Sequence, residues 1–165
     1  MILELRDIIE RPGGSVPFVC ELDTERLSFP AVDAYRSPPR AEGTVTNSAG
    51  ALTLRGVLTA DLVCRCDRCT ALFDTRRVLT LELPIAADLQ DEDNPDIFPL
   101  NGDALDLSEL LETCFILDMD SKFLCREDCA GLCERCGANL NDGPCACPAE
   151  YDPRLAVLQQ LLDDK

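Results

Sequence analysis

Eleven cysteines and no histidine are the strongest constraint that this sequence places on a fold. Closely spaced cysteines are typical either of a disulfide framework or of a metal site. The cysteine count is odd, and the first residues carry acidic side chains without a long apolar run, so we expect neither a disulfide framework nor a secretory signal peptide. Reduced thiols that bind metal in a cytoplasmic protein are the prediction that follows.

The spacing of eight cysteines predicts two zinc sites. Zinc takes four ligands in a tetrahedron, and a tight turn with a cysteine at each end supplies two thiolates together. We assign one site to the C-terminal pairs, Cys133, Cys136, Cys145 and Cys147. We assign the other to the remaining pairs, Cys66, Cys69, Cys125 and Cys129. Gly137 follows the best pair, where the turn requires positive φ.

Two alternatives for these assignments stay open. Cys129 could belong to the C-terminal site, and Cys64 could take the place of Cys66. Cys20, Cys64 and Cys114 lie in apolar patterns, and we interpret them as small core residues. The cofactor prediction is two structural Zn²⁺ ions.

The absence of histidine also restricts catalysis. A Ser/His/Asp triad, a Cys/His dyad and an imidazole general base are excluded. Four thiolates leave zinc no open position for a substrate, so we expect no enzymatic activity. A thiol-redox or metal-handling protein that uses the C-x2-C pairs is the alternative. It is less favoured because a redox pair usually opens a helix, whereas the residues after Cys69 alternate like a strand.

Strand periodicity is clearest in the middle of the chain. Even-numbered positions from Leu52 to Cys66 are apolar or glycine, which predicts a long strand with one buried face and a bulge or a bend at Gly56. Residues 42–46 and the turn-like residues 47–50 predict a hairpin partner before it. Residues 79–85 alternate again and predict a strand that returns alongside.

Two helices are expected after these strands. Apolar residues recur at helical spacing from Leu107 to Phe115, with Asp106 as N-cap. A second helix is expected after Asp152-Pro153. The fold class is therefore α+β: an antiparallel sheet that could close into a barrel, two helices and a zinc-stapled C-terminal segment. We expect residues 1–124 to form the sheet core and residues 125–165 the cysteine-rich segment, packed as one domain.

The chain is strongly acidic, with a formal net charge of −16. This charge favours a basic protein partner and repels phosphate backbones. The run from Asp88 to Gly102 is interpreted as a solvated loop or a docking surface. Four arginines form the densest basic group and could contact RNA or pair locally with acids: Arg65, Arg68, Arg76 and Arg77. We expect no membrane partner, because no stretch approaches about 20 apolar residues. We also expect no small-molecule substrate.

Three motifs resemble the YceD family of large-ribosomal-RNA-subunit accumulation proteins: Cys66-Asp67-Arg68-Cys69, Asp106-Leu107-Ser108-Glu109-Leu110, and the box from Cys125 to Asn141 with Asp152-Pro153-Arg154-Leu155. The resemblance implies a ribosome-biogenesis factor that promotes accumulation of 23S rRNA. Its partner would be a basic large-subunit ribosomal protein, the rRNA, or both. Some members of that family lack much of the C-terminal box, which implies that the site there is dispensable for the shared function.

Overall fold

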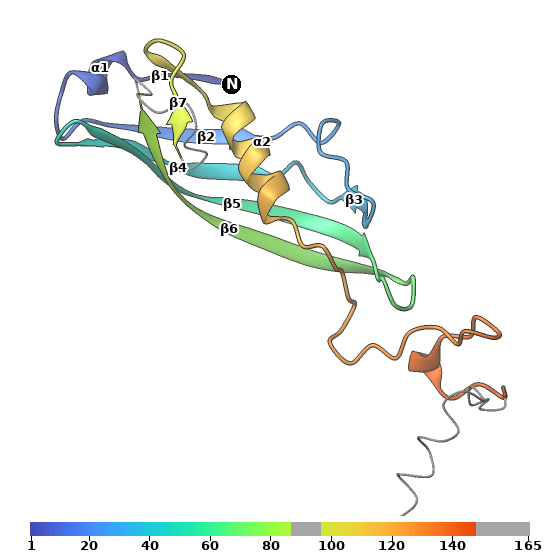
Figure 1. Ribbon diagram of the computed structural model, residues 1–165. Helices are drawn as coiled ribbons and strands as arrows, with labels where there is room; N and C mark the ends of the chain where they lie inside the picture. Colours follow the sequence, from blue (N-terminus) through green and yellow to red (C-terminus); the bar gives the residue numbers. More distant parts are fainter. Residues whose placement is uncertain (87–96, 148–165) are drawn as a thin grey trace, which may run out of the picture.

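A computed structural model of the chain describes residues 1–86 and 97–147 (Figure 1). The elements follow the sequence in the order β1 (Ile2–Glu4), α1 (Arg6–Ile9), β2 (Ser15–Glu21), β3 (Val32–Tyr35), β4 (Arg40–Ser48), β5 (Ala51–Arg65), β6 (Leu72–Ala86), β7 (Phe98–Pro99), β8 (Ala104–Asp106), α2 (Leu107–Asp118) and the 3₁₀ turn η1 (Leu140–Asp142). The two longest strands, β5 and β6, lie side by side.

The β5–β6 hairpin confirms the period of two that the sequence shows. Leu54, Leu58 and Leu62 are fully buried on one face of β5 (0% exposed), because alternate side chains of a strand point to the same side. The returning strand is longer than predicted, since β6 begins at Leu72 and pairs with β5 as far as Ile85.

The expected hairpin partner of β5 is β4. Ser48 pairs with Ala51, so the connection has only two residues, Ala49 and Gly50, with φ of 53° and 93°. Positive φ at both positions is typical of the type I′ turn that matches the twist of antiparallel strands. The buried side chain of Asn47 accepts from the Gly50 N–H and donates to two carbonyl oxygens of α1. The turn therefore also anchors the N-terminal helix.

The main sheet is open, which makes the closed-barrel alternative wrong. Its strand order is β2-β4-β5-β6-β7, and β3 pairs with β5 beyond the end of β4. Within the described residues, the end strands β2 and β7 do not pair with each other. A two-stranded ladder of β1 and β8 lies apart from this sheet. The α+β class is confirmed.

The predicted bulge at Gly56 is also wrong. Gly56 pairs with Gly43 in an unbroken register between β4 and β5. A Cβ atom at Gly56 would lie 2.6 Å from the Glu42 carbonyl oxygen and 3.2 Å from Cζ of Phe18. The glycines are needed because the backbones and the Phe18 ring approach closely at this point.

The helix α2 covers one face of the sheet, as its apolar stripe predicted (Figure 1). Asp106 caps it by accepting the Glu109 N–H at 3.2 Å. The Phe115 ring packs edge-to-face on Phe29 with centroids 5.9 Å apart. The buried carboxylate of Glu112 pairs with Arg26 at 3.1 Å.

The three cysteines assigned to the core are there. Cys20 and Cys64 are buried, and Cys114 is half-buried against the same cluster. Burial raises the pKa of the Cys64 and Cys114 thiols. Two other predictions cannot be compared fully: the helix after Asp152 lies outside the described residues, and so does the 88–96 part of the acidic run. The rest of that run includes the short strand β7.

Candidate metal centres

Eight cysteines come together in two groups beyond the end of the sheet. We name them by position: the proximal group is Cys66, Cys69, Cys125 and Cys129, and the distal group is Cys133, Cys136, Cys145 and Cys147. Within each group the sulfur atoms all lie within 4.8 Å of one another, so each group could hold a metal ion. These are the two sets assigned from the sequence, and zinc binding itself stays a prediction.

The proximal group lies at the tip of the β5–β6 hairpin. Cys66 directly follows β5, and the Thr70 N–H donates to its carbonyl oxygen at 2.9 Å. Thr70 has a φ of 58°, which lets the chain turn back into β6. The hairpin tip thus presents Cys66 and Cys69 in one tight turn.

Cys125 and Cys129 come to this tip from the segment that follows α2. Their sulfurs lie 3.7 Å from Cys69 Sγ and 3.8 Å from Cys66 Sγ, respectively. A regular tetrahedron with Zn–S bonds of about 2.3 Å has sulfur–sulfur edges of about 3.8 Å. The donor set and its spacing therefore fit a four-thiolate zinc site, and Cys64, which is buried in the sheet, is not part of it.

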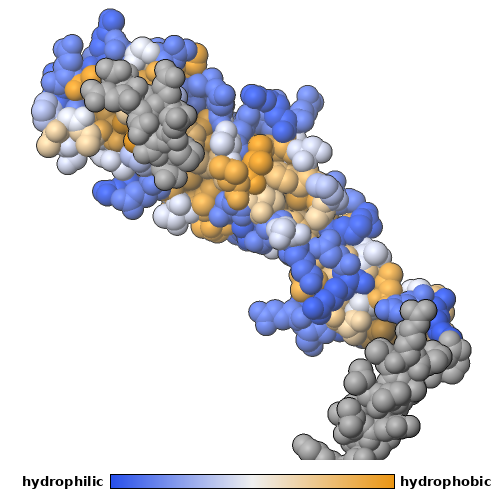
Figure 2. All heavy atoms as spheres, in the orientation of Figure 1, coloured by the Kyte–Doolittle hydropathy of each residue, from blue (hydrophilic) through white to orange (hydrophobic). Residues whose placement is uncertain are grey.

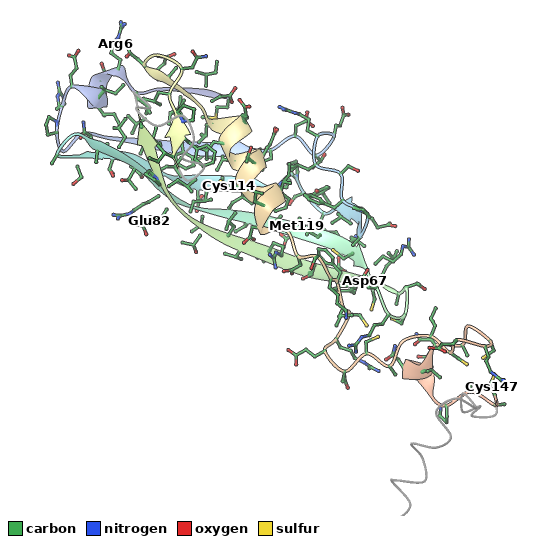
Figure 3. The ribbon with its side chains drawn as sticks, in the orientation of Figure 1. Arg6, Asp67, Glu82, Cys114, Met119 and Cys147 are labelled. Carbon is green, nitrogen blue, oxygen red and sulfur yellow. The ribbon has the colours of Figure 1, made fainter. Side chains whose placement is uncertain are left out.

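Two residues between the hairpin cysteines hold this segment in place. Asp67 exchanges two bonds with Phe123: its carboxylate accepts the Phe123 N–H at 2.6 Å, and its own N–H donates to the Phe123 carbonyl at 2.8 Å. Arg68 donates to the carbonyl oxygens of Glu127 and Cys129. Figure 3 places Asp67 where the tip of the β5–β6 hairpin meets the segment that follows α2.

The distal group is local in sequence and more open to solvent. Cys136 is exposed, and Cys133, Cys145 and Cys147 are half-buried. Gly137 has the predicted positive φ of 71°, and its N–H donates to the Cys133 carbonyl at 2.9 Å. Cys145 Sγ lies 3.3 Å from Cys133 Sγ. Figure 3 shows Cys147 at the opposite end of the described chain from the sheet.

Asn141 links the two groups, and the sequence analysis did not single it out. It lies in the loop between the distal pairs, yet its Nδ2 donates to Cys129 Sγ of the proximal group at 3.3 Å. Its Oδ1 accepts from the Ala130 N–H at 2.8 Å and from Arg126 at 2.6 Å. Such bonds orient a metal ligand and favour its thiolate form. The only sequence signal was its place in the Asn139-Leu140-Asn141 turn.

The thiols of the proximal group divide into two kinds. Burial opposes ionisation of Cys66, but N–H groups led by that of Cys125 outweigh it and lower the pKa of the Cys66 thiol to about 6. The Asn141 amide lowers the pKa of Cys129. Burial and the neighbouring sulfurs raise the pKa of Cys125 to about 12, and the pKa of Cys69 is also raised. A dication would have to displace the protons that the second pair keeps.

The distal group shows the same division. Backbone N–H groups of Cys136 and Arg135 lower the pKa of the Cys133 thiol to about 6. The Cys136 sulfur and burial raise the pKa of Cys147 to about 12. Each group therefore already contains a sulfur that favours the ionised form, which is the form that binds a metal.

The four arginines considered for RNA contact are engaged within the protein. Arg65 pairs with Asp33 at 2.8 Å, and Arg76 lies 3.5 Å from Asp61. Arg77 pairs with two carboxylates, that of Asp118 at the end of α2 at 3.0 Å and that of Asp120 just after it at 2.6 Å. Arg68 is occupied by carbonyl oxygens. This arrangement agrees with the local-pairing interpretation of the basic group.

No helix in residues 1–86 or 97–147 is long and apolar enough to cross a membrane.

Comparison with protein families gives a match over most of the chain. The family model described as "Large ribosomal RNA subunit accumulation protein YceD" matches residues 54–162, which is more than half of the 165 residues. The matched span includes both cysteine groups and the strands and helix that lead to them.

Curated relatives carry less information. Uncharacterized proteins of Mycobacterium bovis (strain ATCC BAA-935 / AF2122/97) and of Mycobacterium tuberculosis (strains CDC 1551 / Oshkosh and ATCC 25618 / H37Rv) are each 29% identical over 111 residues. The aligned region covers 65% of this chain and 54% of each relative, so the chain spans about half the length of these proteins. No solved structure matches the chain.

Proposed function

We propose, because this chain belongs to the YceD family, that it is a non-enzymatic cytoplasmic factor that promotes accumulation of the large-subunit (23S) ribosomal RNA. It acts by binding a basic large-subunit ribosomal protein, and contacts the RNA locally or through that protein. The cysteine groups give it a rigid surface rather than a reactive centre.

The family match carries the proposed role, and the grouping of four sulfurs at each cysteine group supports its non-enzymatic part. Four thiolates complete the coordination of zinc and leave no position for a water or a substrate. The sulfur–sulfur distances of 3.7 and 3.8 Å in the proximal group fit a tetrahedral four-thiolate site, which is the usual form of a structural zinc site. We propose one structural Zn²⁺ in each group.

Charge supports a protein partner over bare RNA. The net charge is −16, and the four arginines of the densest basic group are already paired with acids or carbonyls. A phosphate would have to replace those partners while the excess acidic charge repels it. A basic protein meets no such barrier.

The thiol-redox alternative has less support. A redox C-x2-C pair usually opens a helix, whereas Cys69 leads into the strand β6. Asp67 and Arg68, between its cysteines, are bonded to the segment after α2. Opening this turn for disulfide exchange would break those bonds.

The function is tested by depleting the protein in the organism that encodes it. We expect the amount of large-subunit precursor rRNA to fall while small-subunit rRNA changes little, and we expect a plasmid copy to restore it. Unchanged large-subunit rRNA would refute the proposal. Elemental analysis of the purified reduced protein should give about two zinc ions per chain. A metal-free protein whose cysteines cycle readily between thiol and disulfide would favour the redox alternative.

A further inference from the structure

The long strand β6 has an edge without a partner over most of its length. On one side it pairs with β5 from Leu72 to Ile85, and on the other β7 reaches only Ile85 and Ala86. Within the described residues, no strand pairs with positions 72–84 on that second side. A free strand edge presents backbone N–H and C=O groups that can accept a further strand.

An apolar groove of about 560 Å³ runs along this edge, between β6 and α2. Its apolar lining comprises Leu79, Leu81, Leu83, Pro84, Phe98, Cys114 and Leu117. Leu117 is 79% exposed, and Ile116 beside it on the helix is 50% exposed. Figure 2 shows hydrophobic residues gathered in the middle of the molecule, where Figure 1 places α2 over the sheet. Exposed apolar surface beside a free edge is typical of a docking site.

The charge of the chain decides between possible occupants. A second copy would also carry a charge of −16 and would be repelled. Two acids border the groove, Glu82 and Asp118. Within the chain, Glu82 pairs with Arg55 and Asp118 pairs with Arg77. RNA would be repelled as well, and it has no peptide backbone to continue a sheet. An extended segment of a basic protein fits both the free edge and the charge.

We propose that an extended segment of a basic protein adds to the edge of β6 as a further strand and places alternate apolar side chains in the groove against α2. This inference rests on the proposed function, whose protein partner it locates on the molecule. Backbone hydrogen bonds to β6 contribute affinity, and the groove selects apolar residues at every second position.

Amide hydrogen exchange tests the edge directly. The probes are individually purified large-subunit ribosomal proteins and a short peptide of alternating valine and lysine, with a valine–glutamate peptide as the charge control. On binding of a basic probe, the amides of residues 72–83 that do not bond to β5 should gain protection, whereas those of β2, the strand at the opposite end of the sheet, should not. Protection confined to β2 or to the cysteine segment would overturn the inference.

A matched pair of substitutions tests the groove. Leu117→Glu places a charge in the groove, and Val19→Glu places the same charge at an exposed apolar position on β2 (52% exposed). We expect Leu117→Glu to weaken probe binding at least about tenfold and Val19→Glu to change it less than about twofold. Circular dichroism and thermal unfolding check that both variants fold.

The outcomes separate the inference from the function on which it rests. If ribosomal proteins bind the wild type and Leu117→Glu equally, with no protection of β6, the groove is wrong and the proposed function stands. If no large-subunit protein binds the wild type, both fall. A dimer that Leu117→Glu dissociates would assign the groove to a second copy, and RNA binding that this variant abolishes would assign it to RNA; either would overturn a protein segment as the occupant.

Discussion

The two cysteine groups have the same donor atoms but occupy different kinds of place in the fold. The proximal group joins the tip of the β5–β6 hairpin to a segment more than 50 residues later in the chain, and three of its four cysteines are buried. The distal group closes a loop within residues 133–147, and Cys136 is exposed. Identical chemistry can therefore fasten distant parts of a fold in one case and stabilise a short loop in the other.

The difference has an energetic reason. Closing a long chain segment costs more conformational entropy than closing a short one, so the proximal ligands contribute more to holding the native arrangement. Asp67 and Arg68 also hold the backbone of the segment that carries the proximal cysteines, and Asn141 donates to the Cys129 sulfur. The prediction that the distal site is dispensable for the function shared within the family stays a prediction.

The largest expected effect comes from removing one ligand of each group. Cys129→Ser should leave the proximal site incomplete and detach the segment after α2, with a loss of more than about 4 kcal/mol in the free energy of unfolding. Cys136→Ser should reduce the zinc content by one ion per chain and leave the unfolding of the sheet close to wild type. Thermal unfolding with zinc analysis measures both. Equal losses from the two variants would break the comparison.

Zinc loading should release protons, and the count can be checked. Cys125, with a pKa of about 12, and Cys69, with a raised pKa, keep their protons at pH 7, whereas Cys66, with a pKa of about 6, is largely ionised. Filling the proximal group at pH 7 should therefore release at least the two protons of Cys125 and Cys69. Below the pKa of Cys66 another proton has to leave, so zinc affinity should fall more steeply with acid between pH 7 and 5. Calorimetry in buffers of different ionisation enthalpy gives the count. A pH-independent affinity would contradict it.

Asn141 offers a more selective perturbation of the proximal group. Asn141→Asp keeps the acceptor for the Ala130 N–H but loses the amide that donates to Cys129 Sγ. The zinc affinity of the proximal site should fall about tenfold, as is usual when a bond to a metal ligand is removed. Chelator competition measures it, with Asn101→Asp, at an exposed position beside β8, as the control. If only distal zinc is lost more easily, Asn141 does not support the proximal group.

The smallest expected effect concerns the attachment of the chain to the hairpin tip. Asp67→Ala removes the acceptor of the Phe123 N–H and should cost about 1–2 kcal/mol in the free energy of unfolding. Arg76→Ala removes an exposed ion pair with Asp61 and should cost less than about 0.5 kcal/mol. Urea unfolding of the two variants compares them. A larger loss of unfolding free energy from Arg76→Ala would show that the ion pair between β5 and β6 stabilises the hairpin more than the bond between Asp67 and Phe123 does.

Much of the fold could be predicted because the signals were local. Alternation around Leu54, Leu58 and Leu62 predicted β5, and Asp106 before an apolar stripe predicted α2. The bulge at Gly56 was predicted wrongly, because a glycine in a strand can mark either an irregular register or a close approach of two regular backbones. The N-terminal strands were hard to predict, since prolines and glycines interrupt their pattern.

The sequence by itself determined the chemistry of this protein: eight cysteines in pairs, no imidazole, an excess of acid, and the strands and helix that carry them. Those properties belong to residue types and short spacings, which a chain has before it folds. Only the tertiary structure decided that Cys129 lies with Cys66 and not with Cys133, that Asn141 reaches across to its sulfur, and that positions 72–84 of β6 have no strand beside them on one edge among residues 1–86 and 97–147. Each of these depends on the distance between residues far apart in the chain, and packing alone sets that distance.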